Sequence, residues 1–196
     1  MKYSVEQLLN NGKDYTKEDF IFFWGHHKTN GINKGCFSQW WPCDFKVNGI
    51  KYIFAEQYMM AGKARLFNDQ ESLQKILEAK EPNICKYLGR QVKNFNLKIW
   101  NKNCCQIVIE GNFAKFSQNE YLKQQLLSTE NKILVEASPY DHIWGIKMSK
   151  DDPDCISPNK WKGTNFLGFA LMEVRDLLRE GQIEPVCGLN HLLPKN

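Results

Sequence analysis

The sequence lacks the short motifs that mark common enzyme folds. It contains no GxGxxG, GxxxxGK[ST], GxSxG or HExxH segment, so the mainstream nucleotide-binding folds and the serine hydrolases have no support. No apolar run approaches the roughly 18 residues that a membrane-spanning helix needs. The first residues, MKYSVEQLLNNGKDYTKEDF, are too polar for a secretory signal. We therefore expect a cytoplasmic protein without a membrane partner.

The sequence also lacks the residue spacing of a metal site. Its seven cysteines form no CxxC pair, and an odd number without such a pair indicates reduced thiols in a cytosol-like compartment. Cys36 and Cys43 lie near His26 and His27 along the chain. Their spacing fits no tetrahedral zinc pattern, so buried or unreactive thiols are the better interpretation. We expect no metal and no cofactor.

No repeat, low-complexity tract or linker divides the chain, and its composition suits one folded domain. The 196 residues are 42% hydrophobic and 13% aromatic, enough to fill a substantial core. Lys and Arg outnumber Asp and Glu by 26 to 22, a net charge of +4. This excess is compatible with a phosphorylated or nucleic-acid ligand but is too small to argue for one. We predict a single domain over residues 1–196, and we favour a monomer over an oligomer.

Hydrophobic periodicity predicts a compact α+β fold that is mostly helical and has a small sheet. The Asn48-Gly49 pair between two β-type segments is the strongest short signal for a hairpin. Helices are expected over 3–10, 55–66, 69–79, 82–89, 97–116, 119–127 and 165–179, strands over 20–24, 44–47, 50–54 and 133–136, and loops over 26–35, 139–146 and 150–163.

The predicted helix over 55–66 is apolar, yet it carries Glu56 and Lys63. They are seven residues apart, about two turns, and so lie on one face. Glu56 is either a first-turn carboxylate favoured by the helix dipole or a desolvated group whose pKa is raised toward acid–base use. Lys63 is either a surface lysine or a partly buried amine that can attack a carbonyl or anomeric carbon. Spacing alone leaves both questions open.

Two further segments can have a structural or a functional role. Asp141 and Trp144 follow the strand predicted over 133–136. They form either a turn cap and a core tryptophan, or a carboxylate and an aromatic ring that hold a sugar or base. A basic cluster is either a solvated face or a phosphate site with Arg90 as the forked ligand. Its members are Lys86, Arg90, Lys93 and Lys98.

Several colinear segments together resemble the NADAR family, also called YbiA-like. They are FSQWWPCDFKVNGIKYIFAEQYMMAGKA, LGRQVKNFN, GNFAKFSQN, LVEASPYDHIWGI and GTNFLGFALMEVRDLL. The resemblance covers roughly residues 20–180. It implies a compact, mostly helical α+β fold and an N-glycosidase that acts on ribosylated bases. Two activities are associated with the family: removal of ADP-ribose from guanine in nucleic acid, and hydrolysis of phosphorylated riboflavin-pathway intermediates between ribose and pyrimidine.

The resemblance also implies which residues act. A neutral lysine would add to C1′ of the ribose and hold it as a Schiff base, while the glutamate would protonate the base or manage the water. The aspartate would orient ribose hydroxyls or stabilise positive charge, and a tryptophan would stack on a base. The catalytic positions correspond to Glu56, Lys63 and Asp141, and the substrate-binding positions to Trp100, Trp144, Arg90 and Asn165.

Departures from the family pattern bear on the substrate. Bacterial riboflavin-pathway members have a histidine beside the helix glutamate and an FSNF-like stretch, where this chain has Gln57 and FSQW with Gln39. These differences and the net positive charge favour ADP-ribosyl-guanine over the riboflavin intermediates, so the expected partner is ADP-ribose or ribose phosphate, free or attached to nucleic acid. An alternative of another class is a binding module that recognises ADP-ribose without cleaving it.

Overall fold

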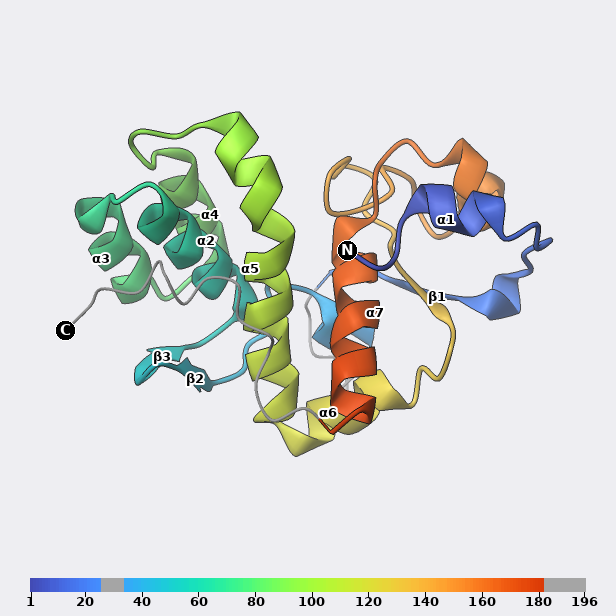
Figure 1. Cartoon of the computed structure of the whole chain (residues 1–196), viewed down its shortest axis with the longest axis horizontal. Coiled ribbons are helices and arrows are strands. Elements are labelled where there is room, and N and C mark those ends of the chain that lie inside the picture. The colour runs from blue at the N-terminus through green and yellow to red at the C-terminus, as the bar shows by residue number, and fades with distance from the viewer. Residues whose placement is uncertain (26–33, 182–196) are drawn as a thin grey trace.

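The computed structural model describes residues 1–25 and 34–181 of the chain. The fold class agrees with the prediction, because helices dominate and the strands are few and short (Figure 1). Within the described residues, no helix is long and apolar enough to cross a membrane.

The long helix α5 (Leu97–Ser117) forms the centre of the molecule. Asn96 caps its start by accepting a hydrogen bond from the Ile99 N–H. Residues 107–116 are all buried, which places this half of the helix inside the protein rather than on its surface. Helix α2 (Ala55–Leu66) packs on one side of α5 and α7 (Phe166–Arg179) on the other (Figure 1).

Helices α3 (Gln70–Glu78) and α4 (Pro82–Arg90) pack against α2 and against each other. Asp69 caps α3 as predicted, accepting from the Ser72 N–H at 3.1 Å. Gly89 lets α4 approach α2 closely, because a Cβ atom there would lie 2.0 Å from the Met60 sulfur. This contact brings the end of α4 against the face of α2 that carries the candidate site.

The strands form two separate two-stranded sheets, where the sequence suggested a single small sheet. The hairpin of β2 (Phe45–Val47) and β3 (Ile50–Tyr52) turns at Asn48-Gly49, with φ angles of 50° and 77°. Strands β1 (Phe20–Phe23) and β4 (Ile133–Glu136) pair in parallel. This parallel pair joins segments more than a hundred residues apart in sequence, and α7 packs against β4.

The remaining helices frame these elements. Helix α6 (Glu120–Leu127) packs against α5 and α7, and α1 (Val5–Asn10) packs against the short 3₁₀ turn Pro158–Lys160. The predicted loop over 150–163 contains this turn and a second one, Pro153–Ile156. The predicted loop over 26–35 lies mostly outside the described residues, and its last two residues begin the 3₁₀ turn Lys34–Phe37.

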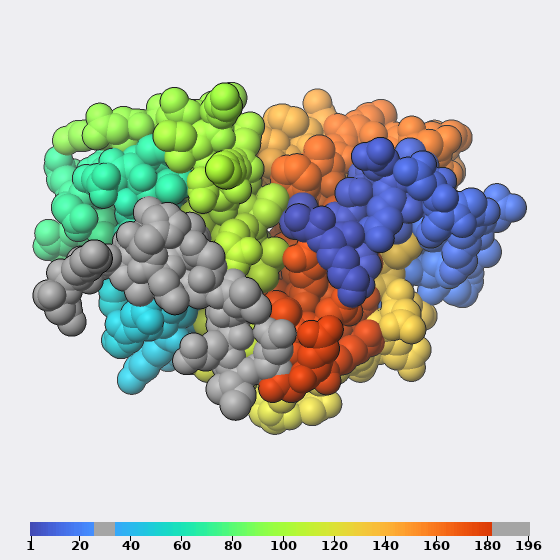
Figure 2. All heavy atoms as spheres, in the orientation of Figure 1, coloured from blue at the N-terminus to red at the C-terminus, as the bar shows by residue number. Residues whose placement is uncertain are grey.

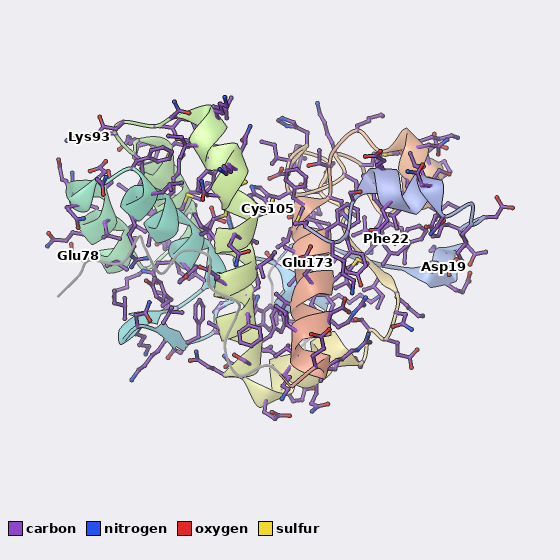
Figure 3. All side chains as sticks on the ribbon, viewed as in Figure 1. Asp19, Phe22, Glu78, Lys93, Cys105 and Glu173 are labelled. Carbon is purple, nitrogen blue, oxygen red and sulfur yellow. The ribbon has the colours of Figure 1, made fainter. Side chains whose placement is uncertain are left out.

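The N-terminal residues are bonded to α7. Lys2 donates from its backbone N–H to Glu173 and from Nζ to Asp176, both on α7. Figure 2 shows these first residues lying against α7. Cys105 of α5 and Glu173 are labelled on the two neighbouring helices in Figure 3. The N-terminus is therefore fastened to α7 of the helical core.

Candidate active site

Glu56 lies in the first turn of α2 and is only 6% exposed. Its backbone N–H donates to the Gln39 carbonyl at 2.9 Å. Its carboxylate accepts a hydrogen bond from the Trp40 side chain, whose single donor is the indole N–H. Burial raises the pKa of Glu56 to about 7, against the opposing effects of Lys86, Trp40 and Arg90 and with a further upward push from Asp141. The acid–base interpretation of Glu56 therefore has the electrostatic environment it needs.

Glu136, the last residue of β4, is a site residue that the sequence analysis missed. Its Oε2 is buried and has no hydrogen-bond partner in the part of the chain that the structure describes. Burial raises its pKa to about 8, and the negative charges of Asp141 and Glu56 act in the same direction against Lys86. The available signal was its place at the carboxyl end of a buried strand, where functional groups collect in parallel sheets.

Asp141 serves as a turn cap and also belongs to the charged cluster. Its Oδ1 accepts from the backbone N–H groups of Ile143 at 2.9 Å and Trp144 at 2.8 Å. The structural interpretation is therefore confirmed for this oxygen. At the same time, its charge raises the pKa of both Glu56 and Glu136. The turn thus fixes a carboxylate near the buried Glu56 and the partly buried Glu136, which belong to other elements.

Lys63 is half-buried on the face of α2 that the sequence predicted. Its Nζ donates to the Gly89 carbonyl at 2.7 Å and lies 4.2 Å from the Phe95 ring centroid and 5.5 Å from that of Trp100. Burial lowers the pKa of this amine, and the nearby Arg90 guanidinium lowers it further. These surroundings increase the neutral fraction of the amine, which is the nucleophilic form.

The predicted basic cluster divides into two parts. Arg90 at the end of α4 acts electrostatically on both Glu56 and Lys63, and Lys86 acts on Glu56 and Glu136. The Lys86 Nζ also lies 5.8 Å from the Trp40 ring centroid. Lys93 instead pairs with Glu71 of α3 at 2.7 Å and projects at the outer end of the helical cluster (Figure 3).

Asn165 contacts the strand rather than an open site. It is fully buried, its Oδ1 accepts from the Glu136 N–H at 3.0 Å, and its Nδ2 donates to the Leu134 carbonyl at 2.9 Å. The amide therefore fastens β4 to the start of α7 and fixes the backbone of Glu136. Trp144 is partly buried, with its ring edge-on to Phe166 at a centroid distance of 6.1 Å.

Gln39 and Gln57 have structural roles, and the argument about substrate that rested on them is corrected. The Gln57 side chain accepts from the Ile53 N–H and donates to the carbonyl groups that end α3. The Gln39 side chain accepts from Asn112 of α5 at 2.7 Å. Both glutamines are buried in these contacts. Their side chains join elements of the core, so these departures do not discriminate between substrates.

An exposed aromatic pair borders the carboxylate cluster. Trp24 follows β1 and is 57% exposed, and Tyr140 precedes Asp141 and is 81% exposed. Their ring centroids are 6.0 Å apart. Because β1 and β4 are parallel and Phe23 pairs with Glu136, Trp24 and Glu136 lie at the same end of the two strands. The sequence analysis left Trp24 unassigned among the tryptophans.

A surface hollow of about 420 Å³ adjoins the site through Trp40. It is otherwise lined by residues that flank the β2–β3 hairpin and by residues at the start of α4, including Phe54, Lys80 and Pro82. This volume lies within the usual range of about 300–1,000 Å³ for small-molecule pockets. Trp40 is thus shared between the Glu56 carboxylate and a space of ligand size. Among the described residues, no group of three or more His, Cys, Asp and Glu is placed to hold a metal ion.

A family model for the NADAR domain matches residues 22–179 of the chain. The chain belongs to the NADAR family. The N-glycosidase R617 of Acanthamoeba polyphaga mimivirus is 48% identical over 164 residues, which are 81% of this chain and 96% of that protein. The N-glycosidase YbiA of Escherichia coli K12 is 30% identical over 138 residues, 70% of this chain and 76% of YbiA.

The solution structure of E. coli YbiA has the same fold as this NADAR protein. The two superpose with a TM-score of 0.67 at 26% identity, over 88% of this chain and 92% of YbiA. The resemblance noted in the sequence is therefore confirmed at the level of family and fold. The carboxyl groups, Lys63 and Arg90 described above all lie inside the matched range.

Proposed function

We infer that this NADAR protein is an N-glycosidase, and we propose that its substrate is guanine that carries ADP-ribose in nucleic acid. One observation carries the proposal. A half-buried amine, Lys63, and a buried carboxyl, Glu56, both lie within the field of the same guanidinium, Arg90. An amine with a lowered pKa and a carboxyl with a raised pKa, both near one guanidinium, are the groups that this chemistry requires.

The proposed reaction follows from the chemistry of N-ribosides, which break through oxocarbenium character at the anomeric carbon. The neutral Lys63 amine adds to C1′ while the bond from C1′ to the base nitrogen breaks, and the base takes a proton. The ribose ring then opens, as the C1′–O4′ bond breaks and a proton passes from Nζ to O4′, so the sugar is held on Nζ as a protonated Schiff base. Water adds to C1′, and release of the amine frees the sugar. Glu56 supplies a proton or activates the water, and Asp141 holds ribose hydroxyls or stabilises the developing positive charge.

Each predicted substrate-binding residue also has a proposed role. Trp100, beside the Lys63 amine, is placed to stack on a ring of the substrate. Arg90 offers a guanidinium fork for a phosphate of ADP-ribose. Trp144 is held by the turn that Asp141 caps, so it supports that turn or stacks on a base. Asn165 contributes by positioning Glu136, since its amide is bonded to β4.

The exposed pair Trp24 and Tyr140 favours a nucleic-acid substrate over a free nucleotide. Exposed aromatic rings next to a reaction centre are typical of single-strand binding, because every base can stack on them. The two rings lie next to each other at the edge of the carboxylate cluster. A base adjacent to the modified guanine could stack there, whereas a mononucleotide would leave the pair unused.

The test compares two substrates with one purified protein. We expect release of ADP-ribose from an oligonucleotide that contains ADP-ribosylated guanine, and much slower release of base from a ribosylamino-pyrimidine phosphate. The opposite ranking would favour hydrolysis of riboflavin intermediates. If neither substrate turns over but calorimetry detects ADP-ribose binding, the protein is a binding module rather than an enzyme.

The aromatic pair gives a second measurement on the same substrates. Replacing Trp24 and Tyr140 by Ala should raise KM for the modified oligonucleotide by about 10-fold or more, because stacking contributes about 1–3 kcal/mol per base. KM for ADP-ribosylated guanosine should stay unchanged. Tyr121→Ala on α6 is the matched control, since it removes another exposed aromatic ring. Equal effects on both substrates would argue against an extended strand.

Asp141→Asn should reduce turnover by at least about 100-fold, the lower end of the effect of one preorganised electrostatic group. The Asn Oδ1 can still accept from Ile143 and Trp144, so the turn and the fold should remain. The control is Asp152→Asn, because Asp152 likewise caps a turn by accepting from the Asp154 N–H. Near-normal turnover of Asp141→Asn in steady-state kinetics would reduce Asp141 to a turn cap.

A further inference from the structure

Glu136 stands out because its backbone is fixed while one oxygen of its carboxyl has no partner among the described residues. Its N–H donates to Asn165 at 3.0 Å, and its carbonyl accepts from the Ile146 N–H at 3.0 Å. A Cβ atom at Gly145 would come within 2.7 Å of that carbonyl, so the chain packs closely around it. Its Oε2 is nevertheless buried without a partner among the described residues. Buried polar atoms are rarely left unpaired, so this oxygen calls for an explanation.

Burial and the charge of Asp141 raise the pKa of both Glu56 and Glu136, and Lys86 lowers both, but the remaining neighbours of the two carboxyl groups differ. The Glu56 carboxylate accepts a hydrogen bond from Trp40 and lies in the field of two cations, Lys86 and Arg90. Among the described residues, the charges that act on Glu136 are those of Asp141 and Glu56, which are negative, and that of Lys86, which is positive. Hydrogen-bond donors and cations favour an ionised carboxylate, whereas burial beside like charges favours the protonated form. Pairs of carboxyls with divergent environments are typical of acid and base partners.

We propose that Glu136 is a further catalytic residue, the general acid that protonates the departing base, and that Glu56 acts as the ionised carboxylate of the site. The proposal rests on the N-glycosidase function proposed above and assigns the proton that this function requires. The raised pKa of Glu136, about 8, agrees with this role, because an acid with such a pKa remains protonated at neutral pH.

The step balances as follows. The proton of the Glu136 carboxyl passes to the base while the bond from C1′ to the base nitrogen breaks and its electron pair stays with the base. Lys63 Nζ forms the new bond to C1′ and becomes positively charged, and Glu136 becomes a carboxylate. The ribose ring opens with transfer of a proton from Nζ to O4′, which gives the protonated Schiff base. Water then supplies hydroxyl to C1′ and a proton to Glu136, and the C1′–Nζ bond breaks as the amine leaves. The amine and the acid both return to their starting states.

The experiment compares leaving groups that do and do not need a proton. Glu136→Gln should lower turnover of the ADP-ribosylated guanine substrate by about 100-fold or more, the usual contribution of a general acid. The same variant should release 4-nitrophenol from 4-nitrophenyl ADP-ribose at a rate close to that of the wild type, because nitrophenolate leaves without a proton. The control is Glu120→Gln, which removes an exposed carboxyl at the start of α6. It should change neither rate.

The pH profile gives a readout that a purely structural role would not change. The wild-type kcat/KM should fall at high pH, where the acid loses its proton, and Glu136→Gln should lose this basic limb. Glu136→Asp should retain the limb with a lower rate, because it keeps a carboxyl.

The outcomes separate the two proposals. Equal losses on both substrates with an unchanged basic limb would make Glu136 structural, and a full rate in Glu136→Gln would remove it from the mechanism. If the protein does not cleave the nitrophenyl substrate, the basic limb of the kcat/KM profile alone tests whether Glu136 is the general acid. A wild-type protein that cleaves neither substrate would overturn the N-glycosidase proposal itself.

Discussion

Glu56→Gln is expected to lower the release of ADP-ribose from guanine by about 1,000-fold, within the usual range for loss of an acid–base group. Gln has nearly the same shape, and its Oε1 can still accept the Trp40 hydrogen bond, so the fold should be kept. What is lost is the negative charge and the ability to exchange a proton. Single-turnover kinetics would measure the rate of the chemical step separately from substrate binding. The affinity for substrate should change little.

A second variant tests the electrostatic environment of Glu56. Trp40→Phe keeps an aromatic ring but removes the N–H that favours the ionised carboxylate. The pKa of Glu56, about 7 in the native protein, should rise further. If Glu56 acts ionised, the acid limb of the pH–rate profile should therefore move to higher pH. Glu78→Gln on α3 is the matched control for Glu56→Gln. A normal rate in Glu56→Gln would exclude Glu56 from the chemistry.

Local signals in the sequence predicted the elements that depend on neighbouring residues. The cap at Asp69 and the Asn48-Gly49 turn are cases where a side chain or a permitted φ angle acts within a few residues. Helix α2 was also predicted within its observed bounds. The cap and the turn could be predicted because the groups that form them lie within a few residues of each other. Helix α2 was instead predicted from its apolar composition, and it packs against α3, α4 and α5.

The parts that the sequence did not predict depend on contacts between distant segments. The pairing of β1 with β4 joins residues 20–23 to residues 133–136, and nothing local in either strand specifies the partner. Glu136 was assigned only to a strand, because its burial beside Asp141 and Glu56 arises from that pairing and from the turn that follows. Residue spacing cannot reveal a carboxyl cluster whose members come from separate elements.

The directions of side chains were the second feature that the sequence could not predict. The sequence grouped Lys86 and Arg90 with Lys93 and Lys98. Helix α4 ends at Arg90, and beyond it Lys93 forms an ion pair with Glu71. Gln57 lies beside Glu56 in sequence, yet consecutive residues on a helix point about 100° apart, so it contacts α3 instead. The family resemblance correctly identified the fold, whereas only the structure separated neighbouring residues with different roles.

Lys63 is expected to form the covalent intermediate, so changes to Lys63 should have the largest effects on activity. Borohydride or cyanoborohydride added during turnover should reduce the imine and fix an ADP-ribose or ribose-phosphate adduct on the protein. Peptide mass mapping should place the adduct at Lys63, because its amine is half-buried against Gly89 and the rings of Phe95 and Trp100.

The pH dependence follows from the direction of the pKa change. Burial and Arg90 lower the pKa of the Lys63 amine, against the attraction of its charged form to the Phe95 ring. A lowered pKa increases the neutral fraction at a given pH, and acid removes that fraction. Adduct formation should therefore decrease as the pH falls through the pKa of Lys63. Arg90→Gln removes the positive neighbour, so the pKa of Lys63 should rise and this decrease should begin at higher pH.

Lys63→Ala should lose both the adduct and turnover, with turnover lowered by at least about 1,000-fold, as for loss of an activated nucleophile. Lys63→Arg should fail as well, because a guanidinium with a pKa above about 12 cannot supply a neutral nucleophile. Lys93→Ala is the matched control, since its ammonium is exposed and paired with Glu71. An adduct on a different lysine, or full activity of Lys63→Ala without a trapped species, would exclude the covalent route. Water activated by Glu56 would then be the attacking group, and Lys63 would bind phosphate.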